Sequence, residues 1–371
     1  MIVLERLTDL LDQVRRAGTI HPVTLEMLDE LGLYRRLEPR GLKAPLVHYW
    51  NGDAPEPIAV FDHAALAEDT RFLFALQCDR LKVVAEAYGL ARDFDAIEIR
   101  LGCEMTDVRQ DADRVVATLR DQTGATAEIE CSHLIRCEGA HSNARKAMAI
   151  EFEGFAFPDA TMTLSIDHDF AAQRDYSYRN YILSPDLWSN LFKWTDLWRL
   201  VLPADPQADP EKLLDDAVIH ERLQRFYPTE RPYQVIAKSI YTVHQRVAKT
   251  FRRGRVLLAG DAAHINSPIG AMGMNSGIHD AINLGDKLSR VLEGAADGLL
   301  DLYVRQRRHA AIVHVQAMTI RNKQLMAEKD PAARRQRHDE LRRAAGDPKA
   351  AREFMLRASL IQSVRDAAAV Q

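Results

Sequence analysis

The chain has 371 residues, roughly two to three times the length of a typical single domain. Hydrophobic residues make up 47% and charged residues 27% of it, and 49 basic against 53 acidic residues give a formal charge of −4. This composition excludes a wholly disordered, collagen-like or coiled-coil chain, and it predicts no general attraction to nucleic acid or to an anionic membrane.

The N-terminal part predicts alternating strands and helices. Residues 2–4 are apolar and end at Glu5, which is typical of a buried strand in a parallel sheet. Residues 21–32 predict a helix, because Pro22 suits its first turn and Gly32 its end. Residues 70–89 predict a strand and then a helix that begins near Gln77.

The middle of the chain predicts β-structure with a two-residue period. The strands are expected at 97–105, 114–121, 126–135, 160–166, 177–184, 187–194 and 197–203. A helix at 211–227 and a strand at 233–244 follow. A further strand at 255–260, a loop and a long helix at about 275–292 come next, and helices are expected from Leu299 to the end.

The four cysteines are few and scattered. They are Cys78, Cys103, Cys131 and Cys137, without a C-x-x-C pair, and no His cluster has zinc spacing. We therefore expect reduced thiols, no metal site and a cytoplasmic protein. Acidic residues interrupt the first apolar run, so no signal peptide is predicted, and no stretch approaches the roughly 18 apolar residues that span a bilayer.

Residues 254–288 carry the strongest functional signal. A buried strand ends at Gly260 and Asp261, at the edge where open α/β sheets bind ligands, and the carboxylate can accept hydrogen bonds from ligand hydroxyls. A loop of small residues then opens a helix whose first N–H groups carry partial positive charge. A planar, polyhydroxylated, electron-accepting ligand suits this arrangement.

The segment resembles the second FAD motif of the class A flavoprotein monooxygenases, the aromatic hydroxylases with the p-hydroxybenzoate hydroxylase fold. The resemblance implies that Asp261 binds the ribityl chain, that Pro268 lies beside the reactive face of the isoalloxazine, and that backbone at 273–275 stabilises charge at N1 and O2. The alternative is an ordinary strand–loop–helix corner. The cofactor-binding residues implied here are Gly260, Asp261, Pro268, Gly270, Gly273, Met274 and Asn275.

Residues 137–148 resemble the D-G-x-x-S-x-x-R motif of the same family, which contributes to FAD and NAD(P)H binding. Gly139, Ser142 and Arg145 match it, whereas Glu138 replaces the usual Asp and moves the carboxylate by one methylene. The alternative is a turn with a solvent-exposed arginine.

Three further positions match the family singly. The resemblance implies that Glu5 binds the adenosine ribose, that Arg16, in the triplet 16–18, lies near the ribose and diphosphate, and that Gln77 contacts the flavin. Alternatively, Glu5 and Arg16 are surface charges and Gln77 caps a helix.

The family's opening strand and G-x-G-x-x-G turn have no counterpart in this sequence. Two explanations are an upstream start codon and a decayed or repurposed family member. In the doubly wound order the absent strand is central, so we expect the chain as given to fold poorly and to bind FAD weakly.

The resemblance implies an α/β (α+β) fold. A Rossmann-like parallel FAD-binding sheet, incomplete at its N-terminal side, is expected at 1–150 and 246–300. An antiparallel substrate sheet is expected at 151–245 and a helical region at 301–371. A homodimer is possible.

The implied reaction uses FAD, NADH or NADPH, and O2 to hydroxylate a small phenol-like substrate through a flavin C4a-hydroperoxide. No catalytic side chain is assigned, and His264 is expected to pack structurally rather than to touch the cofactor. The candidate substrate residues are aromatic, with core packing as the alternative, and Phe192 and Trp194 share a face at strand spacing. They are Tyr181, Trp188, Phe192 and Trp194.

Other functions stay open. One is a flavoenzyme of this fold that does not hydroxylate arenes, although residues 196–203 do not match the halogenase motif W-x-W-x-I-P. Another is a non-catalytic remnant that acts as a binding module. Residues 321–371 hold 12 basic against 7 acidic residues, which predicts a solvated helical face or, alternatively, docking on an anionic partner.

Overall fold

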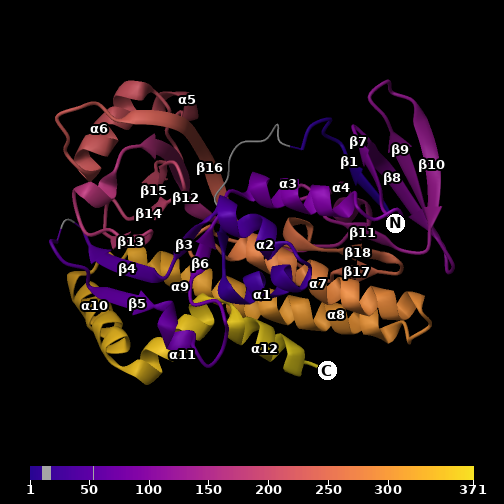
Figure 1. Ribbon diagram of the computed structural model, residues 1–371. Helices are drawn as coiled ribbons and strands as arrows, with labels where there is room; N and C mark the ends of the chain where they lie inside the picture. The colour runs from indigo at the N-terminus through magenta and orange to yellow at the C-terminus, as the bar shows by residue number, and fades with distance from the viewer. Residues whose placement is uncertain (11–17, 53) are drawn as a thin grey trace.

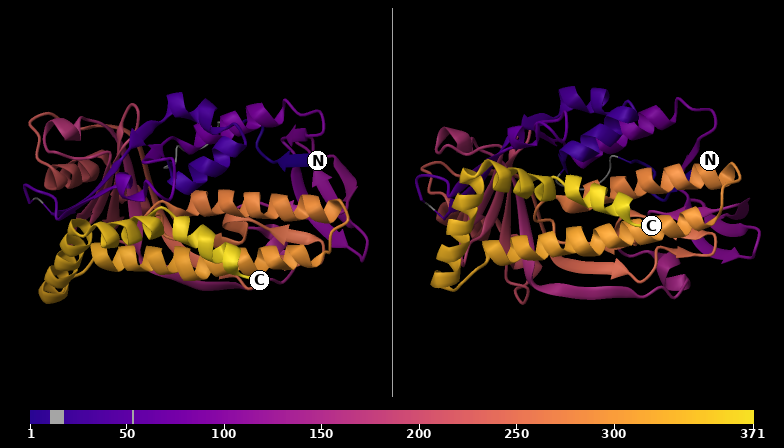
Figure 2. Two further views of the ribbon diagram at one scale, coloured as in Figure 1. Left: turned by 60° about the horizontal axis from the view of Figure 1, so that its bottom comes forward. Right: turned by 90° about the horizontal axis from the view of Figure 1, so that it is seen from below.

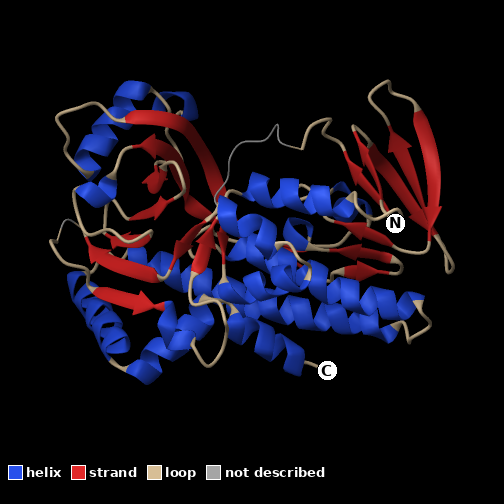
Figure 3. Cartoon of the chain, viewed as in Figure 1, coloured by secondary structure: helices blue, strands red, loops and turns tan. Residues whose placement is uncertain are grey.

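The computed structural model describes residues 1–10, 18–52 and 54–371. A large sheet with its covering helices occupies one end of the molecule, and several small sheets occupy the other (Figure 1). Helices α7 and α8 run side by side between the two ends (Figure 2). The chain is therefore a mixed α/β protein with a helical C-terminal part (Figure 3).

The large sheet has eight strands in the order β19-β16-β12-β15-β14-β13-β4-β5. Neighbouring strands are antiparallel except β13 and β4, which are parallel. The strands are β4 (Leu46–Asn51), β5 (Ala59–Asp62), β12 (Phe152–Asp167), β13 (Arg179–Leu183), β14 (Ser189–Lys193), β15 (Trp198–Ala204), β16 (Gln234–Ala248) and β19 (His264–Ile265).

Four smaller sheets complete the β-structure. Two of them contain the parallel pairs β1–β7 and β11–β18, as the sequence predicts for the cofactor side. The strands are β1 (Ile2–Glu5) with β7 (Glu98–Leu101); β8 (Glu104–Gln110), β9 (Val115–Arg120) and β10 (Thr126–Cys131); β11 (Leu134–Arg136), β18 (Val256–Leu258) and β17 (Arg252–Arg253); and β2 (Thr19–Ile20), β6 (Ala75–Gln77) and β3 (Leu42–Ala44).

The helices lie against these sheets. They are α1 (Pro22–Glu30), α2 (Tyr34–Leu37), α3 (Arg80–Ala91), α4 (Asn143–Ala147), α5 (Pro210–Leu213), α6 (Asp216–Phe226), α7 (Met272–Leu292), α8 (Gly298–His309), α9 (Ala317–Met326), α10 (Pro331–Gly346), α11 (Pro348–Ala358) and α12 (Ile361–Ala369). A π-helical segment, Ala310–Gln316, joins α8 to α9. The prediction of helices from Leu299 to the end is confirmed.

Several predicted boundaries are wrong for local reasons. The strand expected at 97–105 divides into β7 and β8 because Gly102 has φ of +65°. Gln77 ends β6 instead of opening a helix, since Asp79 caps α3 by accepting a hydrogen bond from the N–H of Leu81. Strands β4 and β5 were not predicted at all, and both join the large sheet.

The first strand is parallel, as predicted, but it is not buried. Ile2 and Val3 are 41% and 39% exposed, and among the described residues β1 pairs only with β7. An edge strand covered on one side leaves its apolar side chains in water.

The C-terminal helices cover one face of the large sheet. Their apolar side chains join a buried cluster, called here the substrate-face cluster, that includes Tyr49, Tyr181, Phe192, Ile269 and Met355. Helices α10 and α11 lie against β4 and β5 (Figure 1). The basic residues of 321–371 do not all lie on a solvated face. Two arginines, one on α11 and one on α12, pair with the buried carboxylate of Asp69. They are Arg352 and Arg365.

Candidate cofactor and substrate site

Strand β18 leads into a tight turn at Gly260 and Asp261. Gly260 has φ of +60°, and a Cβ on Gly277 of α7 would lie 3.4 Å from the Cα of Gly260. The positive φ favours glycine at position 260, and a Cβ at position 277 would be in van der Waals contact with the turn. Asp261 is exposed at this turn, at the carboxyl end of the strand, as the sequence predicts.

A buried charged cluster, called here the Asp280 cluster, supports this turn from α7. The Asp280 carboxylate accepts hydrogen bonds from the Gly260 N–H at 2.9 Å and from Arg307 Nε at 2.6 Å, and it bonds His264 Nε2 at 2.8 Å. Burial raises the pKa of Asp280, but His264 and Arg307 outweigh it and lower the pKa to about 2. His264 is thus held inside the protein by its hydrogen bond with Asp280.

The loop at residues 268–275 runs into the start of α7. Gly270 has φ of +98°, and Ala271, with φ of 58°, precedes the helix without a side-chain hydrogen bond that caps it. The helix begins at Met272, three residues earlier than predicted, so residues 273–275 lie in its first turn. Their N–H groups are those that an anionic ligand atom meets at a helix N-terminus.

His21, which the sequence analysis did not single out, joins this loop to α1. Its backbone N–H donates to Asn275 Oδ1 at 2.9 Å, and its Nε2 lies 3.0 Å from the carbonyl oxygen of Gly270. His21 is fully buried, and its Nδ1 has no partner among the described residues. A polar residue directly before Pro22 at a predicted helix start was the only local signal.

Gln77 is connected to the same loop through Thr19. Thr19 Oγ1 donates to Gln77 Oε1 at 2.5 Å, and Gln77 Nε2 donates to the carbonyl oxygen of Tyr178, next to β13, at 3.3 Å. Asn275 Nδ2 in turn donates to the carbonyl oxygen of Thr19 at 2.8 Å. The structure thus brings Gln77, the 268–275 loop and the large sheet together.

The 137–148 segment packs against the Gly260 turn. Arg145 is 4% exposed, and its guanidinium donates to the carbonyl oxygens of Ala262 and Ala140, both at 2.8 Å. The alternative of a solvent-exposed arginine is therefore wrong. Glu138 accepts from the Ser142 hydroxyl and from the Ala144 N–H, and it pairs with Arg136, so its carboxylate fixes the turn beside Gly139.

Glu5 and residues 16–18 are placed only in part. The Glu5 carboxylate, at the end of β1, accepts from the N–H of Leu7 at 2.9 Å. Arg16 lies outside the described residues. Gly18 is described, and a Cβ there would lie 1.8 Å from the carbonyl oxygen of Cys78, so the chain crosses itself closely at this point.

Three of the four substrate candidates lie in the substrate-face cluster. Tyr181, Trp188 and Phe192 are buried there together with Ile269 and Met272. The large sheet therefore meets the 268–275 loop through apolar contacts. The sequence analysis did not predict that Ile269 of the loop and Met272 of α7 pack on the substrate side.

Trp194 differs from the other candidates. Strand β14 ends at Lys193, so strand spacing does not place Trp194 relative to Phe192, contrary to the prediction. Trp194 lies in the turn to β15, where its N–H donates to the carbonyl oxygen of Leu197 and its ring lies 5.0 Å from the Arg199 guanidinium. It is outside the substrate-face cluster.

Residues 1–318 match the family model described as an FAD binding domain. The chain is 32% identical over 352 residues to para-nitrophenol 4-monooxygenase of Pseudomonas sp. (strain WBC-3), covering 92% of this chain and 85% of that protein. The chain belongs to the family of FAD-dependent aromatic monooxygenases. FAD is its cofactor, and the family acts with a reduced pyridine nucleotide and O2 on aromatic substrates.

Two further comparisons describe how far this monooxygenase resembles its relatives. It is 31% identical to 3-(3-hydroxy-phenyl)propionate/3-hydroxycinnamic acid hydroxylase of Mycobacterium sp. (strain KMS), covering 90% of this chain but 58% of that protein. The crystal structure of p-nitrophenol 4-monooxygenase PnpA from Pseudomonas putida DLL-E4 superposes with a TM-score of 0.92 at 29% identity, covering 98% of this chain and 91% of that one. The overall fold is therefore that of the family.

The residues of the monooxygenase fit FAD at the predicted motif. The close approach of Gly260 and Gly277 leaves no side-chain bulk at the turn that carries Asp261. The first turn of α7 has no capping side chain, and the unpartnered His21 Nδ1 is buried beside it. These are the features expected of a backbone cradle for a flat, partly anionic ring.

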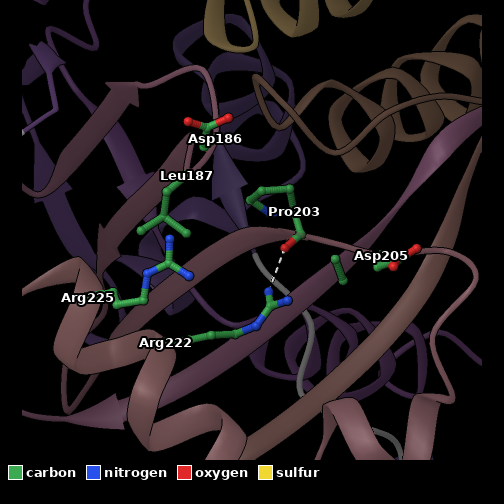
Figure 4. A pocket seen from close by; sticks show the side chains of 7 residues that line it. Asp186, Leu187, Pro203, Asp205, Arg222 and Arg225 are labelled. Carbon is green, nitrogen blue, oxygen red and sulfur yellow. Dashed lines mark hydrogen bonds between the residues drawn. The ribbon is translucent and has the colours of Figure 1, made fainter.

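A separate hollow of about 190 Å³ lies between α6 and the end of β15 (Figure 4). Its charges are balanced, with two aspartates and two arginines, and Arg222 donates to the carbonyl oxygen of Pro203 at 2.8 Å. None of the predicted site residues lines it. In the described part of the monooxygenase, no helix is long and apolar enough to cross a membrane.

Proposed function

We propose that the enzyme uses NADH or NADPH and O2 to hydroxylate a phenol-like substrate held between the 268–275 loop and the large sheet. The observation that carries the proposal is the shared packing of the two sides. Ile269 and Met272, from the loop and the start of α7, are buried in one cluster with Tyr181 and Phe192 of the sheet. A flat ring bound on the loop therefore faces an aromatic, water-free surface.

The predicted residues take distinct parts in this proposal. FAD, when bound, supplies electron transfer from NAD(P)H and oxygen transfer to the ring. Asp261 offers its carboxylate to hydroxyl groups, and the first N–H groups of α7 face negative charge on the ring. The residues that we propose to bind FAD are Glu5, Arg16, Gln77, Gly260, Asp261, Pro268, Gly270, Gly273, Met274 and Asn275, with Glu138, Gly139 and Arg145 contributing to FAD and NAD(P)H binding.

The domain ranges are also proposals: 1–150 with 246–300 for FAD, 151–245 for substrate and 301–371 for the helical region. Strands β4 and β5 extend the substrate sheet into the first range. A para-substituted phenol is the substrate that we favour, because a relative with 32% identity is named para-nitrophenol 4-monooxygenase. The homodimer and the cytoplasmic location remain predictions.

The test is oxidation of NADH and NADPH by the purified chain with FAD in excess and a panel of phenols that includes 4-nitrophenol. We expect a phenol to stimulate both nucleotide oxidation and oxygen consumption, and to yield a hydroxylated product. An FAD-bound chain that no phenol stimulates would contradict the proposal and favour the non-catalytic alternative.

A matched pair of variants tests the cofactor part separately. Asp261→Ala removes the acceptor for ligand hydroxyls and is expected to weaken FAD binding about 10-fold or more, measured by flavin fluorescence. Asp286→Ala, an exposed acid on α7 that pairs with Arg290 at 3.7 Å, should leave FAD binding unchanged. Equal FAD affinity in both variants would show that Asp261 does not hold the cofactor.

A further inference from the structure

Residues 268–271 form a closed turn directly before α7. The N–H of Ala271 donates to the carbonyl oxygen of Pro268 at 2.9 Å, and Gly270, with φ of +98°, has the positive φ that the third residue of a type II turn needs. Ala271 itself has φ of 58° and ψ of 39°, in the left-handed region, which is unfavourable for a residue with a Cβ. Such a residue keeps this conformation only when its surroundings hold it there.

Two side chains hold the peptide groups on either side of Ala271. The carbonyl oxygen of Gly270, before it, lies 3.0 Å from His21 Nε2. The carbonyl oxygen of Ala271 accepts a hydrogen bond from Asn275 Nδ2 at 2.7 Å, and Asn275 Oδ1 in turn accepts from the backbone N–H of His21 at 2.9 Å. Both contacts therefore lead to His21, the first directly and the second through Asn275.

The imidazole of His21 is a fixed hydrogen-bond donor. A carbonyl oxygen can only accept, so Nε2 carries the proton that lies towards Gly270. Burial, as the largest cause, and then the charge of Arg179 lower the pKa of His21 well below its ordinary value, so the ring is neutral at pH 7. His21 directly precedes Pro22, which opens α1, and its backbone is extended with φ of −77° and ψ of 157°. The start of α1 thus carries the donor in one position.

The side chain of Asn275 is fully used by the protein. Its oxygen accepts from His21, and its nitrogen donates to the carbonyl oxygens of Ala271 and of Thr19. A ligand at this place therefore meets the backbone N–H groups of the first turn of α7 rather than the amide of Asn275. The direction of those N–H groups depends on the turn from which the helix starts.

We propose that His21 is a positioning residue for FAD, which holds the strained turn at Ala271 and so directs the first N–H groups of α7 towards the isoalloxazine ring. This inference rests on the part of the proposed function that assigns the 268–275 loop to FAD. His21 acts through Gly270 and Asn275 and needs no contact of its own with the cofactor. Without its Nε2 donor, Ala271 leaves the left-handed region and the N–H groups turn away from the ring.

The test measures the dissociation constant of FAD for the apoprotein by flavin fluorescence in two variants. The amide of His21→Gln extends about as far from the backbone as Nε2, whereas that of His21→Asn reaches only about as far as Nδ1. Both variants keep the backbone hydrogen bond to Asn275. We expect His21→Gln to stay within about 3-fold of the wild type and His21→Asn to bind FAD about 10-fold more weakly. Wild-type affinity in His21→Asn, or an equal loss in both variants, would overturn the proposal.

Thr24→Val is the matched control. The Thr24 hydroxyl, also on α1, lies 2.8 Å from His279 Nε2, one turn further along α7 than Asn275. Valine removes this second buried contact between the two helices and leaves the turn at Ala271 untouched. The free energy of unfolding should fall as it does in His21→Asn, while the dissociation constant of FAD stays unchanged. A loss of FAD affinity equal to that of His21→Asn would show that only the packing of α1 on α7 matters, and the proposal would be wrong.

Ala271→Gly tests the strain directly. Glycine adopts the left-handed region without a Cβ penalty, so the turn should depend less on His21. We expect His21→Asn to weaken FAD binding by less than about 3-fold in the Ala271→Gly background, against about 10-fold in the wild-type background. The same loss in both backgrounds would overturn the proposal. If His21→Asn does not fold, His21→Gln decides: retained affinity supports the proposal, and a loss of about 10-fold or more overturns it.

Failure of this inference is distinct from failure of the proposed function. If phenols stimulate NAD(P)H oxidation but His21→Asn binds FAD as tightly as the wild type, the inference is wrong and the function stands. If the FAD-loaded wild type responds to no phenol, the proposed function is wrong, whereas the difference in FAD affinity between His21→Gln and His21→Asn still tests the role of His21.

Discussion

Two arginines are buried almost equally in this monooxygenase, yet their surroundings differ. Arg307 is 2% exposed and donates to Asp280 at 2.6 Å, in a cluster that also holds His264 and the Gly260 N–H. Arg179 is 4% exposed, its Nε makes no hydrogen bond, and no carboxylate in the described part of the protein pairs with it. The first charge is satisfied by the fold and supports the cofactor turn, whereas the second has no carboxylate partner among the described residues.

The difference separates stability from function. A buried ion pair whose hydrogen bonds are complete is strongly destabilised when one partner is removed. A buried charge without a partner instead costs stability in the free protein, because burial takes it out of water. We therefore expect that removing the charge of Arg307 lowers the free energy of unfolding much more than removing the charge of Arg179.

The largest effect is expected for Asp280→Asn. This change leaves Arg307 buried without a counter-ion and replaces one of the two acceptor oxygens, which serve Arg307 and the Gly260 N–H, with an NH2 group that cannot accept. The free energy of unfolding should fall by about 3–5 kcal/mol, measured by urea denaturation. Asp286→Asn, an exposed position on the same helix, is the control and should change it by less than about 0.5 kcal/mol. Equal stability of the two variants would show that the buried pair of Asp280 and Arg307 does not stabilise the fold.

The Asp280 cluster also shows what could be predicted from the sequence. The segment around Asp261 is continuous in the chain, so its strand, turn and helix were predicted, with the helix start wrong by three residues. The contact of His21 with Asn275 joins positions 254 residues apart, and no local pattern encodes it. For the same reason the pairing of Asp280 and Arg307 and the isolation of Arg179 emerged only from the fold.

The substrate candidates show the same limit on the sheet. Alternation correctly placed Tyr181 and Phe192 in buried strands, because a two-residue period is visible in one segment. It failed at Trp194, where the strand ends one residue earlier in a turn closed by a hydrogen bond to Leu197. Strands β4 and β5 lie far from the rest of the sheet in sequence, so their membership of it could not be predicted.

A medium effect is expected from pH, through His63. Its pKa in the folded protein is about 4, mainly because of burial and secondly because of Arg179, against 6.5 in its ordinary state. The unfolded chain therefore binds the proton first, so the contribution of His63 to stability is complete above pH 6.5 and is lost as the pH falls towards 4. The loss should reach about 3 kcal/mol at most.

Unfolding free energies at pH 7 and pH 4.5 measure this loss. His63→Gln should lose less stability than the wild type over that range, whereas His220→Gln, an exposed position on α6, should behave as the wild type does. A loss of stability that is the same in His63→Gln and wild type would mean that other groups govern the acid response.

The smallest effect on stability is expected for Arg179→Leu, and this variant tests directly whether the two buried arginines differ. Leucine removes a buried cation that has no partner in the described protein, so the free energy of unfolding should stay within about 1 kcal/mol of the wild type or rise. Arg307→Leu, which strips the same charge from a paired site, should instead cost several kcal/mol. If Arg179→Leu destabilised the protein as much as Arg307→Leu, Arg179 would have a structural partner whose loss costs as much as the loss of the Arg307–Asp280 pair.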